Sequence, residues 1–138
     1  MRRVCAAMLA VVLLVLLTVP CFAATAEDNV IMPRFTYMKV LTAYFDIDEN
    51  TGISTSRASC YSLSGYTVEV ECELQRQRTN GWTTIKTWTS TGMDYAEVNK
   101  DWAVMSGYSY RMRATFTVYA SNGNVLEMAV KARYYDYT

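Results

Sequence analysis

TVEVECELQRQR, residues 67–78, is the stretch of sequence that decides the fold. Apolar side chains alternate with glutamates, which is the period-two pattern of a β-strand with one buried face. Successive side chains of a strand point to opposite faces of the sheet, so each set occupies one face. We therefore expect a core face made of Val68, Val70, Cys72 and Leu74 and a solvent face made of Glu69, Glu71 and Glu73.

Six further stretches show similar alternation, are rich in Tyr, Val and Thr, and are separated by turn residues. They cover residues 38–47, 53–60, 82–89, 95–104, 108–120 and 125–134. No stretch is convincingly helical, and no segment repeats another. Seven short strands with turns between them predict an all-β antiparallel sandwich.

Two Asn-Gly pairs set the expected hairpins. A two-residue turn at Asn80-Gly81 is the strongest hairpin signal in the chain, and it keeps Leu74 and Ile85 on one side. Between the last two strands, a three-residue loop over 122–124 places Phe116 opposite Val130, apolar against apolar. The expected buried set is Val70, Leu74, Ile85, Phe116 and Val130.

The last strand and the fifth one complete the expected faces. Alternation in residues 125–134 turns Leu126, Met128, Val130 and Ala132 toward the core, and turns Glu127, Lys131 and Arg133 toward solvent. Lys100 interrupts the apolar face of residues 95–104, so a bulge or a strand end is expected near it.

The first 26 residues have the three regions of a secretory leader. A basic start, Met1-Arg2-Arg3, precedes an apolar run over 4–18, and small residues follow Pro20. Ala23 and Ala26 both fit the residue before a cleavage site. The apolar run is shorter than the ~20 residues of a spanning helix. We expect a signal peptide over 1–26, one domain over 27–138, and a secreted, extracellular product of the general secretory route without a membrane anchor.

Charge and composition exclude several function classes. The chain has 13 Lys and Arg, 13 Asp and Glu, and no His. Because Arg2 and Arg3 leave with the leader, 11 basic and 13 acidic side chains remain, a net charge of −2. That balance argues against a nucleic-acid partner. Without His, most hydrolytic triads and zinc sites are unavailable, so we expect no enzyme, no cofactor and no metal.

Four cysteines occur, and two of them, Cys5 and Cys21, lie in the leader. Cys60 and Cys72 remain in the mature domain. An even count in an oxidising compartment predicts a Cys60–Cys72 disulfide. The alternative is two separate buried thiols, since free cysteine packs as a small hydrophobe.

Two segments resemble known immunoglobulin-like domains. Residues 107–114, GYSYRMRA, look like the sixth strand of fibronectin type III domains, which starts with a tyrosine corner. Residues 74–76 and 80–85 with Trp88 are similar to the hairpin of small secreted immunoglobulin-like proteins of Gram-positive bacteria, a family without an assigned function. The resemblance, over about 53–133, implies a seven-strand immunoglobulin-like sandwich. The sixth strand has no Cys and the third no Trp, which departs from antibody-type domains.

The turn over residues 46–52 is the candidate cation site. Asp46, Asp48 and Asn50 offer oxygen ligands at alternate positions, as calcium loops do. However, Gly52 comes one place late, and Arg57 stands where a calcium loop would place its glutamate. The other interpretation is an exposed polar turn. The same carboxylates are the candidates for a glycosidase pair, although a turn does not place them on opposite sides of a substrate.

The candidate binding surface combines aromatic and basic side chains on one expected face. Alternation places Trp82, Lys86 and Trp88 beside Arg111 and Arg113, next to the glutamates of 69–73. Tryptophans at a surface suit a protein hot spot or a sugar-stacking platform, and they can also simply cover hairpin backbone. We expect a non-catalytic binding or adhesion module for an extracellular protein, with no nucleic-acid partner. A carbohydrate-binding module using Trp82 and Trp88 is the alternative, followed by a small carboxylate-based hydrolase.

Overall fold

The structure is a computed structural model that describes residues 34–138, and the expected signal peptide lies outside this range. The described part folds as one compact unit of seven strands. Their bounds are β1 (Met38–Asp48), β2 (Ile53–Ser62), β3 (Thr67–Arg78), β4 (Gly81–Met93), β5 (Tyr95–Ala103), β6 (Tyr108–Tyr119) and β7 (Val125–Tyr137). The expected strands are all present, and β4 and β7 extend past their expected ends.

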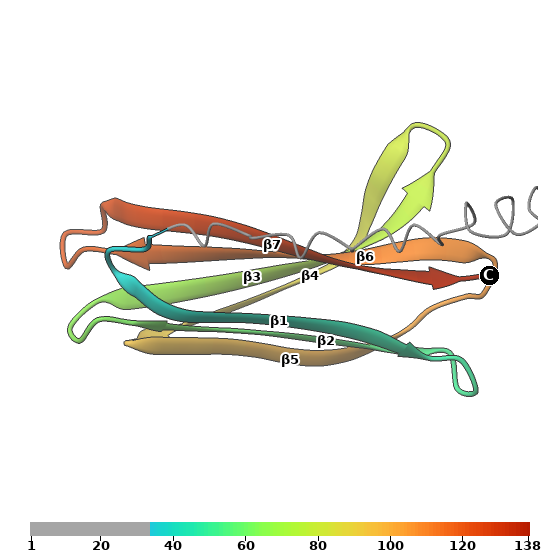
Figure 1. Cartoon of the computed structure of the whole chain (residues 1–138), viewed down its shortest axis with the longest axis horizontal. Coiled ribbons are helices and arrows are strands. Elements are labelled where there is room, and N and C mark those ends of the chain that lie inside the picture. The colour runs from blue at the N-terminus through green and yellow to red at the C-terminus, as the bar shows by residue number, and fades with distance from the viewer. Residues whose placement is uncertain (1–33) are drawn as a thin grey trace, which may run out of the picture. The chain divides into compact units, whose positions relative to one another are not determined.

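The strands form two facing sheets, with the order β1-β2-β5 in one and β4-β3-β6-β7 in the other (Figure 1). Every neighbouring pair is antiparallel. The structure therefore confirms the all-β antiparallel sandwich. Because β1 and β7 lie at the same side of the two sheets, and β4 and β5 at the other, each side of the sandwich is a seam between two edge strands.

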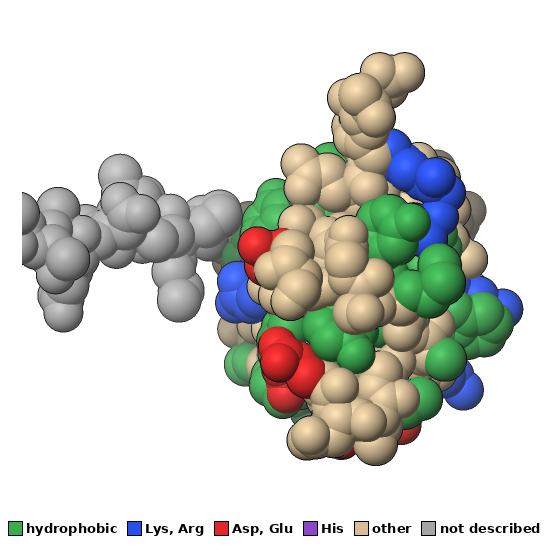
Figure 2. All heavy atoms as spheres, turned by 90° about the vertical axis from the view of Figure 1, so that its right-hand side faces the viewer, with side chains coloured by type: hydrophobic (Ala, Val, Ile, Leu, Met, Phe, Trp, Pro, Cys, Tyr) green, Lys and Arg blue, Asp and Glu red, His purple; other side chains and the backbone are tan. Residues whose placement is uncertain are grey.

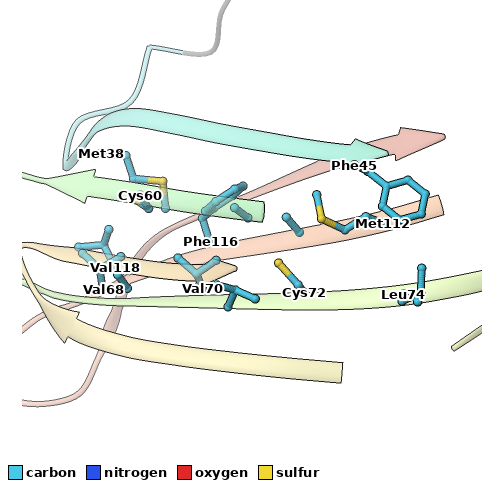
Figure 3. Packing of buried hydrophobic residues seen from close by; sticks show 14 of the residues in the cluster. Met38, Phe45, Cys60, Val68, Val70, Cys72, Leu74, Met112, Phe116 and Val118 are labelled. Atoms are coloured by element: carbon cyan, nitrogen blue, oxygen red, sulfur yellow. The ribbon is translucent and has the colours of Figure 1, made fainter. Parts of the chain in front are cut away.

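The core lies between the sheets and follows the alternation of β3 (Figure 3). Val70 pairs with Phe116 and Leu74 with Met112, and all four side chains are fully buried. Tyr110 lies at one end of this core. Its hydroxyl donates to the Met105 carbonyl (2.8 Å) and accepts from the Met105 N–H (3.2 Å). This contact is a tyrosine corner at the start of β6.

The hairpin between β3 and β4 differs from the expected one. The chain turns over Thr79 and Asn80, and Gly81 follows with φ 115°, a value that favours glycine. The register then shifts at Ile85: Gln75 pairs with Thr84, but Leu74 pairs with Lys86. The bulge turns Ile85 into a half-buried residue rather than the expected core residue. From this bulge the tip of the hairpin, residues 75–85 and called the arm below, projects from the sandwich (Figure 1).

The alternation expected for β7 is wrong. A register shift next to Val118 places Glu127 opposite it, so Phe116 pairs with Ala129 rather than with Val130. Met128 and Val130 are consequently exposed, at 58% and 48%. The predicted alternation placed the polar residues Glu127, Lys131 and Arg133 toward water. In the structure they face the seam with β1 and bind backbone groups there.

The expected disulfide is also not formed, since Cys60 and Cys72 are free and buried. Cys60 comes two residues before the end of β2, whereas Cys72 lies five residues into β3. The two side chains therefore lie at different positions along the strands. Figure 3 shows Cys60 beside Met38, and Cys72 on the other side of Val70. Each thiol instead packs in the core as a small hydrophobic group.

No bulge or strand end occurs at Lys100. The register of β2 and β5 runs without a shift from Cys60↔Ala96 to Ser54↔Trp102. Lys100 is exposed although it shares its face with buried Val98. β5 is an edge strand, and its second half, residues 99–103, is exposed throughout. Lys100 and Trp102, both in this half of β5, belong to surfaces described below.

Candidate functional site

Side-chain hydrogen bonds close the seam between β1 and β7. The carboxylate of Glu127 accepts the backbone N–H groups of Thr36 (2.8 Å), Tyr37 (2.9 Å) and Met38 (2.8 Å). Farther along β7, Lys131 donates to the Leu41 carbonyl and Arg133 to the Ala43 carbonyl, both at 3.0 Å. Free strand edges are prone to pair with other chains, so these bonds protect the edge of β1.

The pKa of Glu127 reflects this arrangement. Partial burial works to raise the pKa, but the three N–H donors favour the ionised form and together hold it below its usual range. Glu127 is therefore a charged group held by backbone dipoles. Sequence alternation could not find it, because a glutamate in a strand is ordinarily assigned to the solvent face.

The opposite face of β7 carries a row of exposed apolar side chains. Met128, Val130 and Tyr134 are 58%, 48% and 63% exposed, and Ala132 lies between the last two. Met128, Val130 and Tyr134 are exposed and Ala132 is partly exposed, because alternate residues of β7 bind β1. We call these four residues the apolar row. An uninterrupted apolar surface of this kind is typical of interaction sites.

One end of the apolar row meets the arm. Trp82 packs edge-to-face on Tyr134, with ring centroids 5.8 Å apart, and the Arg111 guanidinium lies 4.6 Å from the centroid of Trp82. The Nε of Arg111 also donates to Gln75 Oε1 at 2.6 Å, which fixes the guanidinium in place. We call Trp82, Arg111 and Tyr134 the aromatic corner. Together with the apolar row it forms the docking face.

Arg113 lies beside this face but is already paired. Its Nη1 is 2.7 Å from Glu73 Oε2, the one ion pair among residues 34–138. The pair is partly exposed, so its expected contribution to stability is only about 0.2–1 kcal/mol. It shows that the predicted contact between the glutamates of β3 and the arginines of β6 forms at one position. The other predicted cations, Lys131 and Arg133, lie at the seam.

Lys86 and Trp88, the remaining members of the predicted surface, lie on the opposite face of β4. They pair with Leu74 and Cys72, whose side chains face the core, because the bulge at Ile85 reverses the alternation. Lys86 Nζ is 4.7 Å from the ring centroid of Trp102, and Trp88 packs edge-to-face on the same indole at 6.3 Å. The five predicted residues thus belong to two separate surfaces.

Two aromatic residues of these surfaces were missed by sequence reasoning. Trp102 shares the core face of β5 with Val98, but 40% of it is exposed, which regular alternation does not predict. Tyr134 belongs to the tyrosine-rich end of the chain with Tyr135 and Tyr137. In the structure Tyr135 and Tyr137 instead donate to Glu49 at the β1–β2 turn, at 3.1 and 3.2 Å. Longer alternation through residue 137 would have separated Tyr134 from these two.

The two buried thiols and the carboxylate of Asp48 are not free reactive groups. Burial, with a smaller effect of Glu127, raises the pKa of the Cys60 thiol to about 11. Burial and Glu71 raise that of Cys72 to about 12, so both thiols are protonated near neutral pH. Asp48 Oδ1 accepts the Asn50 N–H at 2.9 Å as a turn cap, which lowers its pKa. No cluster of potential metal ligands occurs among residues 34–138.

Comparison of the chain with protein-family models, curated proteins and solved structures found no match. Within residues 34–138, no helix is long and apolar enough to cross a membrane.

Proposed function

We propose that the protein is a secreted, non-catalytic binding module that recognises a protein partner through the docking face. The observation that carries this proposal is the exposure of Met128, Val130 and Tyr134 along one side of an edge strand. Met, Tyr, Trp and Arg are the residues enriched in the buried centres of protein interfaces, and the docking face contains all four.

The aromatic corner favours a protein over a neutral glycan as the partner of this face. The rings of Trp82 and Tyr134 are inclined by 62°, so they do not form a flat platform on which consecutive sugars could stack. Trp82 and Trp88 lie on opposite faces of β4 and cannot share one ligand platform. A shaped apolar surface with an anchored arginine suits the side chains of a protein.

A non-catalytic role is supported by the chemistry of the side chains. The chain has no His to act as a general base, and both mature thiols are protonated at neutral pH. Of the turn carboxylates, Asp48 caps a backbone N–H and Glu49 accepts a tyrosine hydroxyl. A carboxylate-based hydrolase would need two of these groups free on opposite sides of a substrate.

The likeness to small secreted immunoglobulin-like proteins of Gram-positive bacteria forms part of the proposal. It is supported by the tyrosine corner at Tyr110 and by the strand order β1-β2-β5 and β4-β3-β6-β7. Domains of this architecture commonly present binding surfaces at the cell exterior, although the fold does not define the ligand.

Site-specific photo-crosslinking tests the proposal. A photoreactive amino acid at position 130 should capture a specific protein partner from the native surroundings, whereas the same group at Tyr44, 51% exposed on the other sheet, should not. The captured protein is then purified, and its affinity is measured for Trp82→Ala and Tyr134→Ala. A loss of about 2 kcal/mol or more is expected for an anchor residue. Equal capture at both positions, or unchanged affinity in both variants, refutes the proposal.

A further inference from the structure

A group of cations lies on the other face of the arm, away from the docking face. Arg76 and Arg78 continue the core-facing alternation of β3 after Leu74, and Lys86 is paired with Leu74. On β5, Lys100 and Trp102 share the core-facing side with Val98. Arg76, Lys86 and Lys100 therefore lie on the faces of their strands that border the seam between β4 and β5, and Arg78 follows on the same face of the arm. We call them, with Trp102 and Tyr108, the basic strip.

Two of these cations rest on exposed aromatic rings. The Arg76 guanidinium is 4.5 Å from the ring centroid of Tyr108, and Lys86 Nζ is 4.7 Å from that of Trp102. Tyr108 and Trp102 are 37% and 40% exposed. The Nε of Arg76 is buried and has no hydrogen-bond partner among the described residues. A buried donor without a partner is uncommon in folded proteins.

No carboxylate of the four strands around the strip shares its face. The glutamates of β3 and the acidic residues of β5, Glu97 and Asp101, point to the outer faces, where Asp101 binds Thr55 and Glu97 binds Tyr95. Neither Arg76 nor Lys86 belongs to the ion pair found in residues 34–138. Figure 2 looks onto this end with the arm at the top, and it shows Lys, Arg and hydrophobic side chains together on the right, with Asp and Glu mainly on the left.

We propose that the basic strip is a second binding site, which takes an anionic polysaccharide. Arg76 and Lys86 bind a carboxylate, phosphate or sulfate group carried by the glycan, through charge-assisted hydrogen bonds. Sugar rings next to this group stack on the exposed parts of Trp102 and Tyr108.

The arrangement favours a glycan over the other polyanions. A single nucleic-acid strand is bound along a continuous basic groove, whereas these cations gather at one end of a domain with a net charge of −2. An acidic peptide would be held by the cations but leaves the two exposed rings without a stacking partner. Export, which the leader predicts, would bring the domain into contact with acidic glycans.

Binding to polygalacturonate, with neutral dextran and oligothymidylate as comparison ligands, tests the proposal. Wild-type protein should bind polygalacturonate more weakly as salt rises, and should ignore dextran. The double variant Arg76→Gln/Lys86→Gln should lose about a hundredfold in affinity, because each of its two charge-assisted interactions is worth about tenfold. The matched control is Lys39→Gln/Arg57→Gln, which removes two exposed cations from the other sheet and should leave the affinity unchanged.

A second measurement needs no variant. In the wild-type protein, polygalacturonate should protect Lys86 from acetylation, read by mass spectrometry, and should leave Lys39 reactive. The proposal is overturned if Lys86 is not protected, if both double variants bind alike, or if Trp102→Ala leaves the affinity unchanged. Equal affinity for oligothymidylate overturns the assignment to a glycan. Phosphorylated mannan, tested in parallel, distinguishes a phosphate-bearing ligand from a carboxylate-bearing one.

Discussion

Replacing Glu127 with alanine should release the first residues of β1 from the sandwich. Its carboxylate accepts three backbone N–H groups, those of Thr36, Tyr37 and Met38. The bonds to Tyr37 and Met38 are partly buried, whereas the bond to Thr36 is exposed, and water replaces a lost partner more easily there. Counting about 1 kcal/mol for each partly buried bond and less for the third gives a loss of about 2–3 kcal/mol in the free energy of unfolding.

Chemical denaturation and amide hydrogen exchange measure this effect. Glu127→Ala should lower the denaturation midpoint and speed the exchange of amides 36–38. Glu97→Ala is the matched control, because Glu97 is exposed and accepts only the Tyr95 hydroxyl at 2.7 Å. Equal stability of the two variants, with amides 36–38 still protected, would contradict this role of Glu127.

The same residue predicts a pH dependence. The pKa of Glu127 is lower in the folded protein than its ordinary value of 4.5, so its contribution to stability is fully present above about pH 4.5. As the pH falls through the folded pKa, the carboxylate is protonated and the contribution is lost. The difference in stability between wild type and Glu127→Gln should therefore shrink on acidification. A difference that stays constant down to pH 3 or so would contradict the assigned charge state.

Three further predictions follow from the core and the thiols. Phe116→Ala should cost roughly 3–5 kcal/mol of stability in denaturant melts, because the ring is fully buried, and a loss below about 1 kcal/mol would show that the site is not tightly packed. Tyr110→Phe removes the hydroxyl contact with Met105 and should cost about 1–2 kcal/mol by the same melts, whereas an unchanged midpoint would mean that the corner is not stabilising. Cys60 and Cys72 should resist alkylation in the native protein and react after unfolding without reductant, as read by intact mass, and failure of both to react in denaturant would indicate a disulfide.

The alternation of apolar and polar residues predicted the fold best in strands that have one face on the core and the other on the outer surface. β3 lies inside its sheet, so Val70 and Leu74 face the core and Glu71 faces the outer surface, as expected. For β7 the same reasoning failed. One of its faces meets the backbone of β1, which binds Glu127 and Lys131, and a polar side chain on this face is stable without water.

The candidate site was predicted only in part, because β4 is not a regular strand. Trp82 and Arg111 were expected on one face, and they are in contact. Lys86 and Trp88 were placed with them because the strand was assumed to be regular. The single bulged residue, Ile85, reverses the alternation for everything after it, and a bulge leaves little trace in the pattern of residue types.

The seam between β1 and β7 also determines how the domain would respond to a mechanical load. Glu127 meets residues 36–38 near the start of both strands, and Arg133 meets Ala43 farther along both, so the two strands run side by side in the same direction. Tension applied between the first and last residues would shear this seam lengthwise. A few side-chain bonds resist it in place of a backbone ladder. Stretching should therefore open this seam first, while β1 stays bound to β2 by its backbone ladder and the sheet that carries the docking face stays intact.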